Sequence, residues 1–405
     1  MDDRRKQNRS SITDSLRKLL LDTWHVGTSL LSDADLQKSK PEYILSRMLS
    51  LKSAVSTDSA LAGINQRVQD DQASQTSSCI GAGQCGVVYA LKGTTMVIKL
   101  PQSLDKFDSL YNDFKCHEMV CKAFLNVSAA YRGHVHVPAL KMWVSPESEH
   151  FWGTNQALFS EDAQVPDHGL VSERIYPLPL PVRSALVDAF APEAVRERKH
   201  DFLSMQKNKD CLIRLYMGRR NDDAPPVAAD RFHLRNFPLH INEMERLKLK
   251  ASYFAELMAH ALAILHWCAG LDANDVEFVF GSSPEVSAMP TSQDLSTVDK
   301  DSAATLFKSD FHHRTIGVWL LDFNQCQTFN KDNNGLKQLV DAFYWKDPYY
   351  PRPTSTNSKD QLLWKAFSVR YLEVSAEFVD HEMPRAFITS VEEESKKRSA
   401  NSLFG

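Results

Sequence analysis

Asp275 and Glu277 stand two positions apart after a long apolar stretch, a spacing that could support chemistry. If the segment 276–280 is extended, both carboxylates point to the same face of the strand. Neighbouring carboxylates repel each other, which splits their pKa values and leaves one able to act as a base near neutral pH. The pair could also hold a cation, and a guanidinium fits carboxylates best. The alternative is a polar turn after a helix, where Asp and Asn are common.

A lysine ends an apolar run of strand character at Val97, Ile98 and Lys99. An ammonium group held on such a strand can reach the α and β phosphates of a nucleotide. Glu118 follows within a segment of helical periodicity, and we expect it to pair with the lysine. The alternative for Glu118 is an exposed position on an amphipathic helix, which is the commoner place for a glutamate.

A glycine-rich run precedes this lysine, with Gly81, Gly83 and Gly86 in the pattern G-x-G-x-x-G-x-V. Backbone N–H groups can approach phosphates closely where side chains are absent. A dinucleotide-binding loop would be followed by a helix, whereas residues 87–91 are β-branched and strand-like. The run therefore predicts a glycine-rich hairpin, either one that covers phosphates or an ordinary one.

The third acidic position is Asp322, which follows an apolar strand and begins the run Asp322, Phe323, Asn324. Asn tolerates left-handed backbone geometry nearly as well as the glycine it would replace. The alternative is an ordinary turn at the end of a strand.

Together these motifs resemble the signatures of protein kinases, in which the aspartate of Asp-Phe-Gly holds magnesium on the nucleotide. The resemblance implies an α+β, two-lobed protein-kinase-like fold with an N-terminal helical extension, and it places Asp275 at the position of the catalytic base. Ala273 and Asn274 replace the usual His-Arg, and Glu277 stands where a lysine is usual. Phe280 replaces the asparagine that holds a second magnesium ion, so ordinary phosphoryl transfer lacks one ligand.

Three further segments resemble a fungal family of unknown function that is sometimes labelled a zinc-finger protein. These segments are residues 272–281, the hinge-like residues 173–179 and residues 347–353, and the resemblance spans about residues 80–378. Some proteins of that family are arginine-containing cyclodipeptide synthases. The resemblance implies an aminoacyltransferase that joins arginine from arginyl-tRNA to a second aminoacyl-tRNA and releases a cyclic dipeptide. An ATP-dependent small-molecule kinase and a pseudokinase-like scaffold remain the alternatives.

The resemblances and the acidic pattern assign roles to particular residues. The catalytic group is expected to be Asp275, Glu277, Asp322 and Lys99. Substrate binding is expected of Asp272, Asn274, Asn324 and Glu118. No metal or cofactor is required unless the kinase alternative holds, when Mg²⁺ and ATP are expected.

A tRNA acceptor arm needs a basic surface. Two clusters could supply it: Arg214, Arg219 and Arg220, and then Arg246, Lys248 and Lys250. The alternative for both clusters is a solvated charged face.

The chain divides into four parts by composition and periodicity. Residues 1–75 are expected to form a helical extension and linker, with apolar residues at helical spacing in two stretches. Residues 76–176 are expected to form the first lobe, and residues 177–392 a helical second lobe around one long helix at 242–266. An exposed insertion is expected near 281–309, and a flexible tail at 393–405.

Composition indicates a globular protein, with 43% hydrophobic and 24% charged residues among 405. The net charge of -4 argues against a uniformly basic nucleic-acid binder. The seven cysteines have no zinc-like spacing, and residues 1–10 do not resemble a signal peptide. We therefore expect reduced thiols, no transmembrane helix and a cytoplasmic location.

Overall fold

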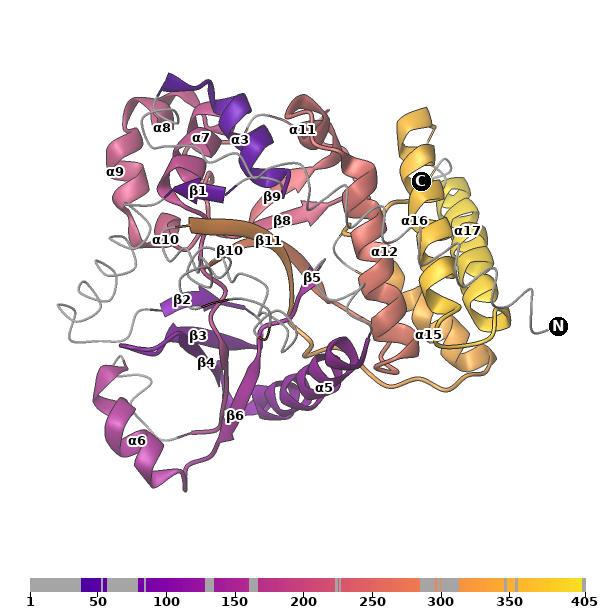
Figure 1. Cartoon of the computed structure of the whole chain (residues 1–405), viewed down its shortest axis with the longest axis horizontal. Coiled ribbons are helices and arrows are strands. Elements are labelled where there is room, and N and C mark those ends of the chain that lie inside the picture. The colour runs from indigo at the N-terminus through magenta and orange to yellow at the C-terminus, as the bar shows by residue number, and fades with distance from the viewer. Residues whose placement is uncertain are drawn as a thin grey trace.

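The computed structural model describes residues 38–51, 54–56, 79–83, 85–127, 135–159, 167–222, 225, 227–284, 296, 299, 313–345, 348–353 and 356–402. These residues form an α+β protein with two separate sheets, as expected from the sequence. Each sheet belongs to one of two lobes, which lie one above the other in Figure 1. We call them the small lobe and the large lobe.

The small lobe is an antiparallel five-stranded sheet in the order β2-β3-β4-β7-β6. Its strands are β2 (Cys79–Ala82), β3 (Gly86–Ala90), β4 (Met96–Pro101), β6 (Leu140–Val144) and β7 (Gly169–Glu173). The long helix α5 (Phe107–Asn126) packs beside the sheet. Short helices complete it: η1 (Leu104–Lys106), α6 (Glu149–Asn155) and η2 (Gln156–Leu158). The expected glycine-rich hairpin, the strand that contains Lys99 and the helical segment around Glu118 all form.

The small lobe folds this way because its strands bury apolar residues, many of them β-branched, and its helix is amphipathic. β4 buries Val97, Ile98 and Leu100, and β-branched residues of this kind favour strands. The helix α5 buries Leu110, Asp113 and other residues along one stripe. A buried aspartate within an apolar stripe is unusual, and its partners are described with the site.

The large lobe contains a second sheet, so the expectation of a mainly helical lobe is incomplete. Its order is β1-β11-β10-β8-β9, and β5 pairs in parallel with β11. The strands are β1 (Ala54–Ser56), β5 (Val135–His136), β8 (Ile213–Tyr216), β9 (Phe237–His240), β10 (Glu277–Pro284) and β11 (His313–Leu321). Several of these strands are too short to carry a clear alternating pattern.

The strand β10 extends through Gly281, where an exposed insertion was expected to begin. A Cβ at Gly281 would collide with Ile175 of the segment that joins the two lobes. The glycine therefore permits a close approach between a strand and the interlobe connection. Residues 285–312, apart from Ser296 and Asp299, lie outside the described residues, and the expected insertion falls mostly there.

The helices of the large lobe surround this sheet (Figure 1). They are α3 (Pro41–Leu49), α7 (Leu180–Phe190), α8 (Glu193–Glu197), α9 (Lys199–Ser204), α10 (Gln206–Lys209), α11 (Ile241–Arg246), α12 (Ala251–Trp267), α15 (Asn333–Phe343), α16 (Ser358–Ser375) and α17 (Glu382–Ser402). The central helix α12 is almost wholly buried and packs along α16.

The long helix expected over residues 242–266 is two helices, α11 and α12. Lys248 between them has φ 56°, a left-handed conformation that an α-helix cannot contain. The apolar periodicity continues across the break because both helices face the same core, including Met244 and Leu257.

The two ends of the chain differ from expectation where they are described. Within the expected N-terminal extension, α3 packs on α7 and β1 pairs with β11, so both belong to the large lobe. The first predicted helix, at 15–24, lies outside the described residues. The tail expected to be flexible from residue 393 is helical as far as Ser402. Tyr344 accounts for this, because its hydroxyl donates to the Val391 carbonyl and its ring lies under Arg398.

All seven cysteines are free thiols. Within the described part of the chain, no helix is long and apolar enough to cross a membrane.

Candidate functional site

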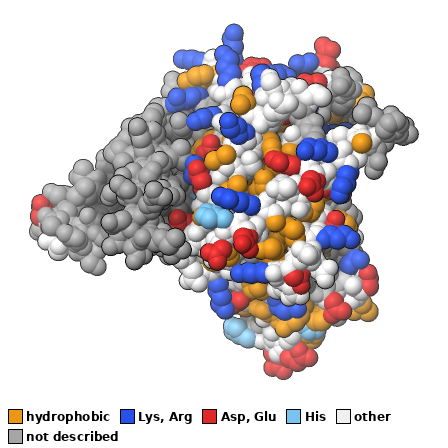
Figure 2. All heavy atoms as spheres, turned by 90° about the vertical axis from the view of Figure 1, so that its right-hand side faces the viewer, with side chains coloured by type: hydrophobic (Ala, Val, Ile, Leu, Met, Phe, Trp, Pro, Cys, Tyr) orange, Lys and Arg blue, Asp and Glu red, His pale blue; other side chains and the backbone are white. Residues whose placement is uncertain are grey.

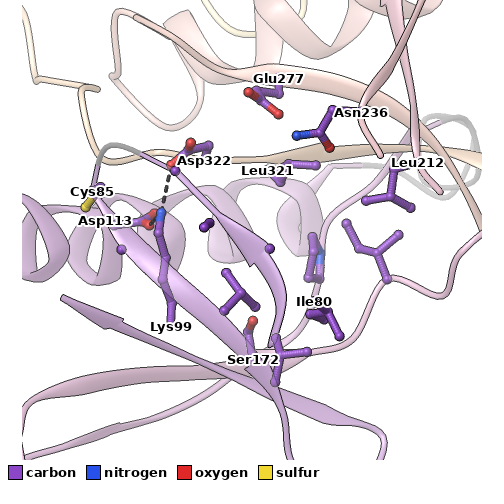
Figure 3. Close-up of a pocket in the computed structure, with 18 of the residues that line it drawn as sticks. Ile80, Cys85, Lys99, Asp113, Ser172, Leu212, Asn236, Glu277, Leu321 and Asp322 are labelled. Carbon is purple, nitrogen blue, oxygen red and sulfur yellow. Dashed lines mark hydrogen bonds and ion pairs between the residues drawn. The ribbon is translucent and has the colours of Figure 1, made fainter. Parts of the chain in front are cut away.

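A cleft of about 220 Å³ lies between the two lobes. The glycine-rich hairpin, β4, β7 and α5 line it from the small lobe, and β8, the loop before β9, β10 and the end of β11 line it from the large lobe. Its polar lining contains five carboxylates and three cations: Asp113, Glu173, Asp210, Glu277, Asp322, Lys99, Arg214 and Arg235. Figure 3 shows how several of these side chains converge.

Lys99 lies at one end of the cleft between two carboxylates. Its ammonium group donates to Asp113 at 2.7 Å and to Asp322 at 2.8 Å. Burial alone would lower the pKa of Lys99, but the two carboxylates outweigh it and hold the pKa well above its ordinary value. The lysine is therefore a permanent cation, and its expected approach to Asp322 is confirmed. We call Lys99, Asp113 and Asp322 the lysine clamp.

Asp113, and not Glu118, is the helix residue that pairs with Lys99. Glu118 lies on the outer side of α5 and pairs with Lys122 one turn away. The periodicity of α5 explains the difference, because Asp113 belongs to its buried stripe whereas Glu118 is exposed. The surface alternative for Glu118 is therefore the correct one, and its expected pairing with the lysine was wrong.

The clamp also fixes the turn that follows β11. Asp113 accepts a hydrogen bond from the Phe323 backbone N–H at 3.1 Å, and the Asn112 amide donates to the carbonyls of Asn324 and Cys326. Asp322 has φ 66°, a left-handed conformation that aspartate tolerates better than most residues. Helix α5 thus holds the aspartate in a defined position facing the cleft.

Asn324 does not line the cleft. It is buried, its backbone carbonyl accepts the hydrogen bond from Asn112, and its side-chain oxygen has no hydrogen-bond partner among the described residues. The structure thus gives Asn324 a position in the turn and does not place it where it was expected to bind substrate.

Glu277 lies in the cleft at the first position of β10 and forms an ion pair with Arg214 of β8. Its cross-strand partner on β11 is Leu321, so Asp322 follows at the adjacent strand end. Figure 3 shows Glu277 above Asp322, both facing the cleft. The acidic pair of the cleft is therefore Glu277 and Asp322.

Asp275 does not share a face with Glu277. It has φ 63°, so the chain turns before β10 begins and the expected extended spacing is absent. Its carboxylate accepts from the Gln325 side chain at 2.6 Å and borders a separate hollow of about 10 Å³, room for about one water molecule. The turn alternative describes Asp275 better than a site in the cleft.

Asp272 and Asn274 belong to the same turn and also lie away from the cleft lining. Asp272 is buried and accepts hydrogen bonds from the backbone N–H groups of Asn274 and Gln327 and from the Gln338 side chain. Burial raises its pKa, which these hydrogen bonds oppose. Asp272 therefore ties the turn to the segment after β11 and is not available to a substrate.

The glycine-rich hairpin forms the small-lobe wall of the cleft, with Gly81, Gly83 and Gly86 in its lining. A Cβ at Gly86 would collide with the carbonyl oxygen of Leu100 and lie 3.2 Å from Cγ of Lys99. At Gly83 a Cβ would meet nothing within 4 Å. Gly86 is therefore required for packing against β4, whereas Gly83 leaves space above the cleft.

A second charged cluster in the cleft was not expected from the sequence. Asp210 lies between Arg174 at 3.5 Å and Arg235 at 4.0 Å. Asp210 and Arg235 line the cleft. We call these three residues the arginine cluster. Its residues come from three separate loops. Arg174 belongs to the hinge-like segment 173–179, whereas Asp210 and Arg235 carry no sequence signal of their own.

Three of the six basic residues expected to form a tRNA surface pair with carboxylates, namely Arg214, Arg220 and Arg246. Arg220 donates five hydrogen bonds to Glu245 and Asp360, and Arg246 pairs with Glu42. On the face that Figure 2 shows, Lys and Arg side chains alternate with Asp and Glu. Arg214 is the member of these clusters that lies in the cleft.

Residues 318–383 match a family described as DUF3669, zinc finger protein. The match covers a short part of the 405 residues. It contains one cysteine, Cys326, and one histidine, His381, whereas a structural zinc site needs four ligands. Within the described residues no group of His, Cys, Asp and Glu could hold a metal ion. No curated protein and no solved structure matches the chain.

Proposed function

We propose that this protein is an aminoacyltransferase of the arginine-containing cyclodipeptide synthase type, with the interlobe cleft as its site. The family matched over residues 318–383 is described as a zinc finger protein, a label that the fungal family resembled by the motifs also carries. The observation that carries the proposal is the acidic cleft, in which five carboxylates face three cations. Such a lining favours a cationic arginyl group over a nucleotide triphosphate.

The reaction needs no cofactor, because the aminoacyl esters are already activated. The α-amine of one aminoacyl-tRNA attacks the ester carbonyl of the other and loses a proton as the peptide bond forms. The bond from the carbonyl carbon to the ester oxygen breaks, and the first tRNA leaves with a free terminal hydroxyl, whose oxygen takes up the proton that the amine has lost. The free amine of the dipeptidyl ester then attacks its own ester carbonyl. The second tRNA leaves in the same way, and the six-membered ring closes.

In this proposal the cleft carboxylates take the two roles first expected of Asp275 and Glu277. Asp322 has 27% of its side chain exposed, and its clamp contact uses the oxygen Oδ1, so it holds the arginyl guanidinium. Glu277 stands at the adjacent strand end and takes the proton from the attacking amine. Lys99 holds Asp322 in place from behind.

Expression in a bacterial host, which supplies charged tRNAs, tests this function. Mass spectrometry of the medium is expected to find arginine-containing diketopiperazines with the wild type. Glu277→Gln and Asp322→Asn are each expected to lower their yield about 100-fold or more, the usual size of a lost acid–base group. The melting temperature of each variant shows whether it is folded.

Asp275→Asn is the matched control, because Asp275 lies in the same segment but outside the cleft. It is expected to keep most of the product. Glu277→Asp retains the charge that Arg214 needs and is expected to recover part of the yield. Loss of product with Asp275→Asn and retention with both cleft variants would contradict the proposed site.

An ATP-dependent small-molecule kinase is the second candidate. It is favoured by the contact of Lys99 with Asp322 beneath a glycine-rich hairpin, the arrangement that protein kinases use for nucleotides. Titration with Mg-ATP separates the two functions. Tight binding with ATP turnover supports the kinase, whereas product formation without ATP supports aminoacyl transfer.

A further inference from the structure

The arginine cluster is not neutral. Arg174 and Arg235 share the single carboxylate of Asp210 at 3.5 and 4.0 Å. Arg214, the third arginine nearby, is already paired with Glu277. The cluster of Arg174, Asp210 and Arg235 therefore carries one more positive charge than Asp210 balances.

The two guanidinium groups also have unused hydrogen-bond donors. Within the described residues, neither Arg174 nor Arg235 donates a side-chain hydrogen bond, and the Nε atom of each is buried. The side chain of Arg174 is only 10% exposed. Buried donors nearly always have partners, and leaving them without one costs free energy.

Arg220 shows what a satisfied arginine is like in this same protein. It donates to both oxygens of Asp360 and both oxygens of Glu245, at 2.6 to 3.2 Å. The contrast indicates that the arginine cluster is arranged to receive a further anionic partner.

We propose that Arg174 and Arg235 bind a backbone phosphate of the tRNA acceptor end. This inference rests on the proposed function. A phosphate presents several oxygens to two guanidinium forks at once, and Arg235 lies in the cleft lining where such a group can reach it. Asp210 holds the two guanidinium groups together before the phosphate arrives.

The position of the arginine cluster fits a substrate that is positively charged at one end and negatively charged at the other. Figure 3 places Leu212 and Asn236, the sequence neighbours of the cluster, on the far side of Glu277 from Lys99. An aminoacyl ester of tRNA has a cationic amino acid on one side of the ester and phosphates on the other. The amino acid lies toward Asp322, and the phosphate lies toward Arg235.

Binding of an uncharged tRNA transcript, measured by fluorescence anisotropy over a range of salt, tests the inference. Arg235→Gln is expected to weaken binding about tenfold, the value of one charged hydrogen-bond partner. It is also expected to reduce the slope of log K against log salt by about 1, as for the loss of one phosphate contact. The matched control Arg196→Gln, on the exposed surface of α8, is expected to bind like the wild type.

The same binding measurement is repeated with a transcript that lacks its last three nucleotides. The wild type is expected to bind it as weakly as Arg235→Gln binds the full transcript, and Arg235→Gln is expected to bind both alike. Arg235→Lys, which retains the charge, is expected to keep the salt slope. Unchanged melting temperatures show that the variants are folded.

The outcomes separate this inference from the function on which it rests. Equal affinity and salt slope for wild type and Arg235→Gln would overturn the phosphate site, and continued diketopiperazine formation would leave the function standing. An equal loss with Arg196→Gln would also overturn the site, since the effect would then be general charge. If AMP raises the melting temperature of the wild type but not of Arg235→Gln, while no tRNA binds, the ligand is a free nucleotide and both proposals fail.

Discussion

The two ends of the cleft are built from three charged residues each, with the signs reversed. In the lysine clamp one cation lies between Asp113 and Asp322, and in the arginine cluster one carboxylate lies between Arg174 and Arg235. The clamp distances of 2.7 and 2.8 Å are hydrogen bonds, whereas the cluster distances of 3.5 and 4.0 Å are looser ion pairs.

The clamp holds the fold as well as lining the cleft, whereas the arginine cluster makes no such tight contact. The clamp joins β4 and α5 of the small lobe to the end of β11 in the large lobe. Its hydrogen bonds fix the position of one lobe relative to the other. In the arginine cluster the Nε donors of Arg174 and Arg235 have no partner among the described residues. Asp322 of the clamp can therefore meet a ligand only through the oxygen that Lys99 does not use, whereas the cluster has donors that no protein group uses.

The largest loss of stability is expected from a variant that breaks the lysine clamp. Asp113→Asn removes a buried charge from Lys99 and is expected to lower the free energy of unfolding by about 3 kcal/mol. Chemical denaturation measures it. Glu118→Gln, on the exposed side of the same helix, is the control and is expected to change stability by less than about 0.5 kcal/mol. Similar losses from both variants would contradict the assignment of Asp113 as the partner of Lys99.

A second variant moves the lysine without removing a charge. Gly86→Ala places a Cβ against the Leu100 carbonyl and beside Lys99, so we expect a loss of about 2 kcal/mol from overpacking. Gly83→Ala meets nothing within 4 Å and is expected to leave stability unchanged. Thermal unfolding of both variants checks the pair, and an equally destabilised Gly83→Ala would show that the hairpin lies differently.

The opposite end of the cleft is expected to respond weakly. Asp210→Asn weakens loose ion pairs and keeps a side-chain oxygen that can still accept from Gln206, so we expect a loss of about 1 kcal/mol, near the upper limit for weak pairs. The same variant leaves both guanidinium groups without a carboxylate and is expected to strengthen tRNA binding. A loss of unfolding free energy as large as that of Asp113→Asn would show that the arginine cluster stabilises the fold as much as the lysine clamp does, and would contradict the difference between the two ends of the cleft.

The smallest effect concerns pH. Because the folded state raises the pKa of Lys99 above its unfolded value of about 10.5, the clamp contributes its full stability below that pH. The contribution is lost only as pH rises through the higher folded value. The stability difference between wild type and Asp113→Asn is therefore expected to stay constant from pH 7 to 10. A difference that shrinks below pH 10 would show that Lys99 loses its proton early.

Local motifs were reliable wherever short-range spacing decides the structure. The glycine-rich hairpin and the strand that ends near Lys99 form as expected, because turn glycines and β-branched runs act over a few residues. The meeting of Lys99 with Asp322 was also expected, since both positions carried motif signals. The paired acids at Asp275 and Glu277 were placed wrongly, because spacing of two assumes an extended chain and Asp275 has φ 63°.

Partners that come from distant segments had no local signal. Asp113 was missed in favour of Glu118, although the apolar stripe of α5 could have identified it as the buried acid. The cluster of Arg174, Asp210 and Arg235 joins three loops, and only the hinge-like segment around Arg174 had been noted, with no role given to the arginine.

The sequence alone determined the kinds of element and the residue types available for chemistry, because backbone preference and apolar periodicity are local properties. The tertiary structure decided which carboxylates face the cleft and which accept hydrogen bonds inside the lobe. Asp272 and Asp322 illustrate this, since the first accepts three hydrogen bonds within its own lobe and the second faces the cleft. Their difference depends on which distant donors the fold brings within about 3 Å.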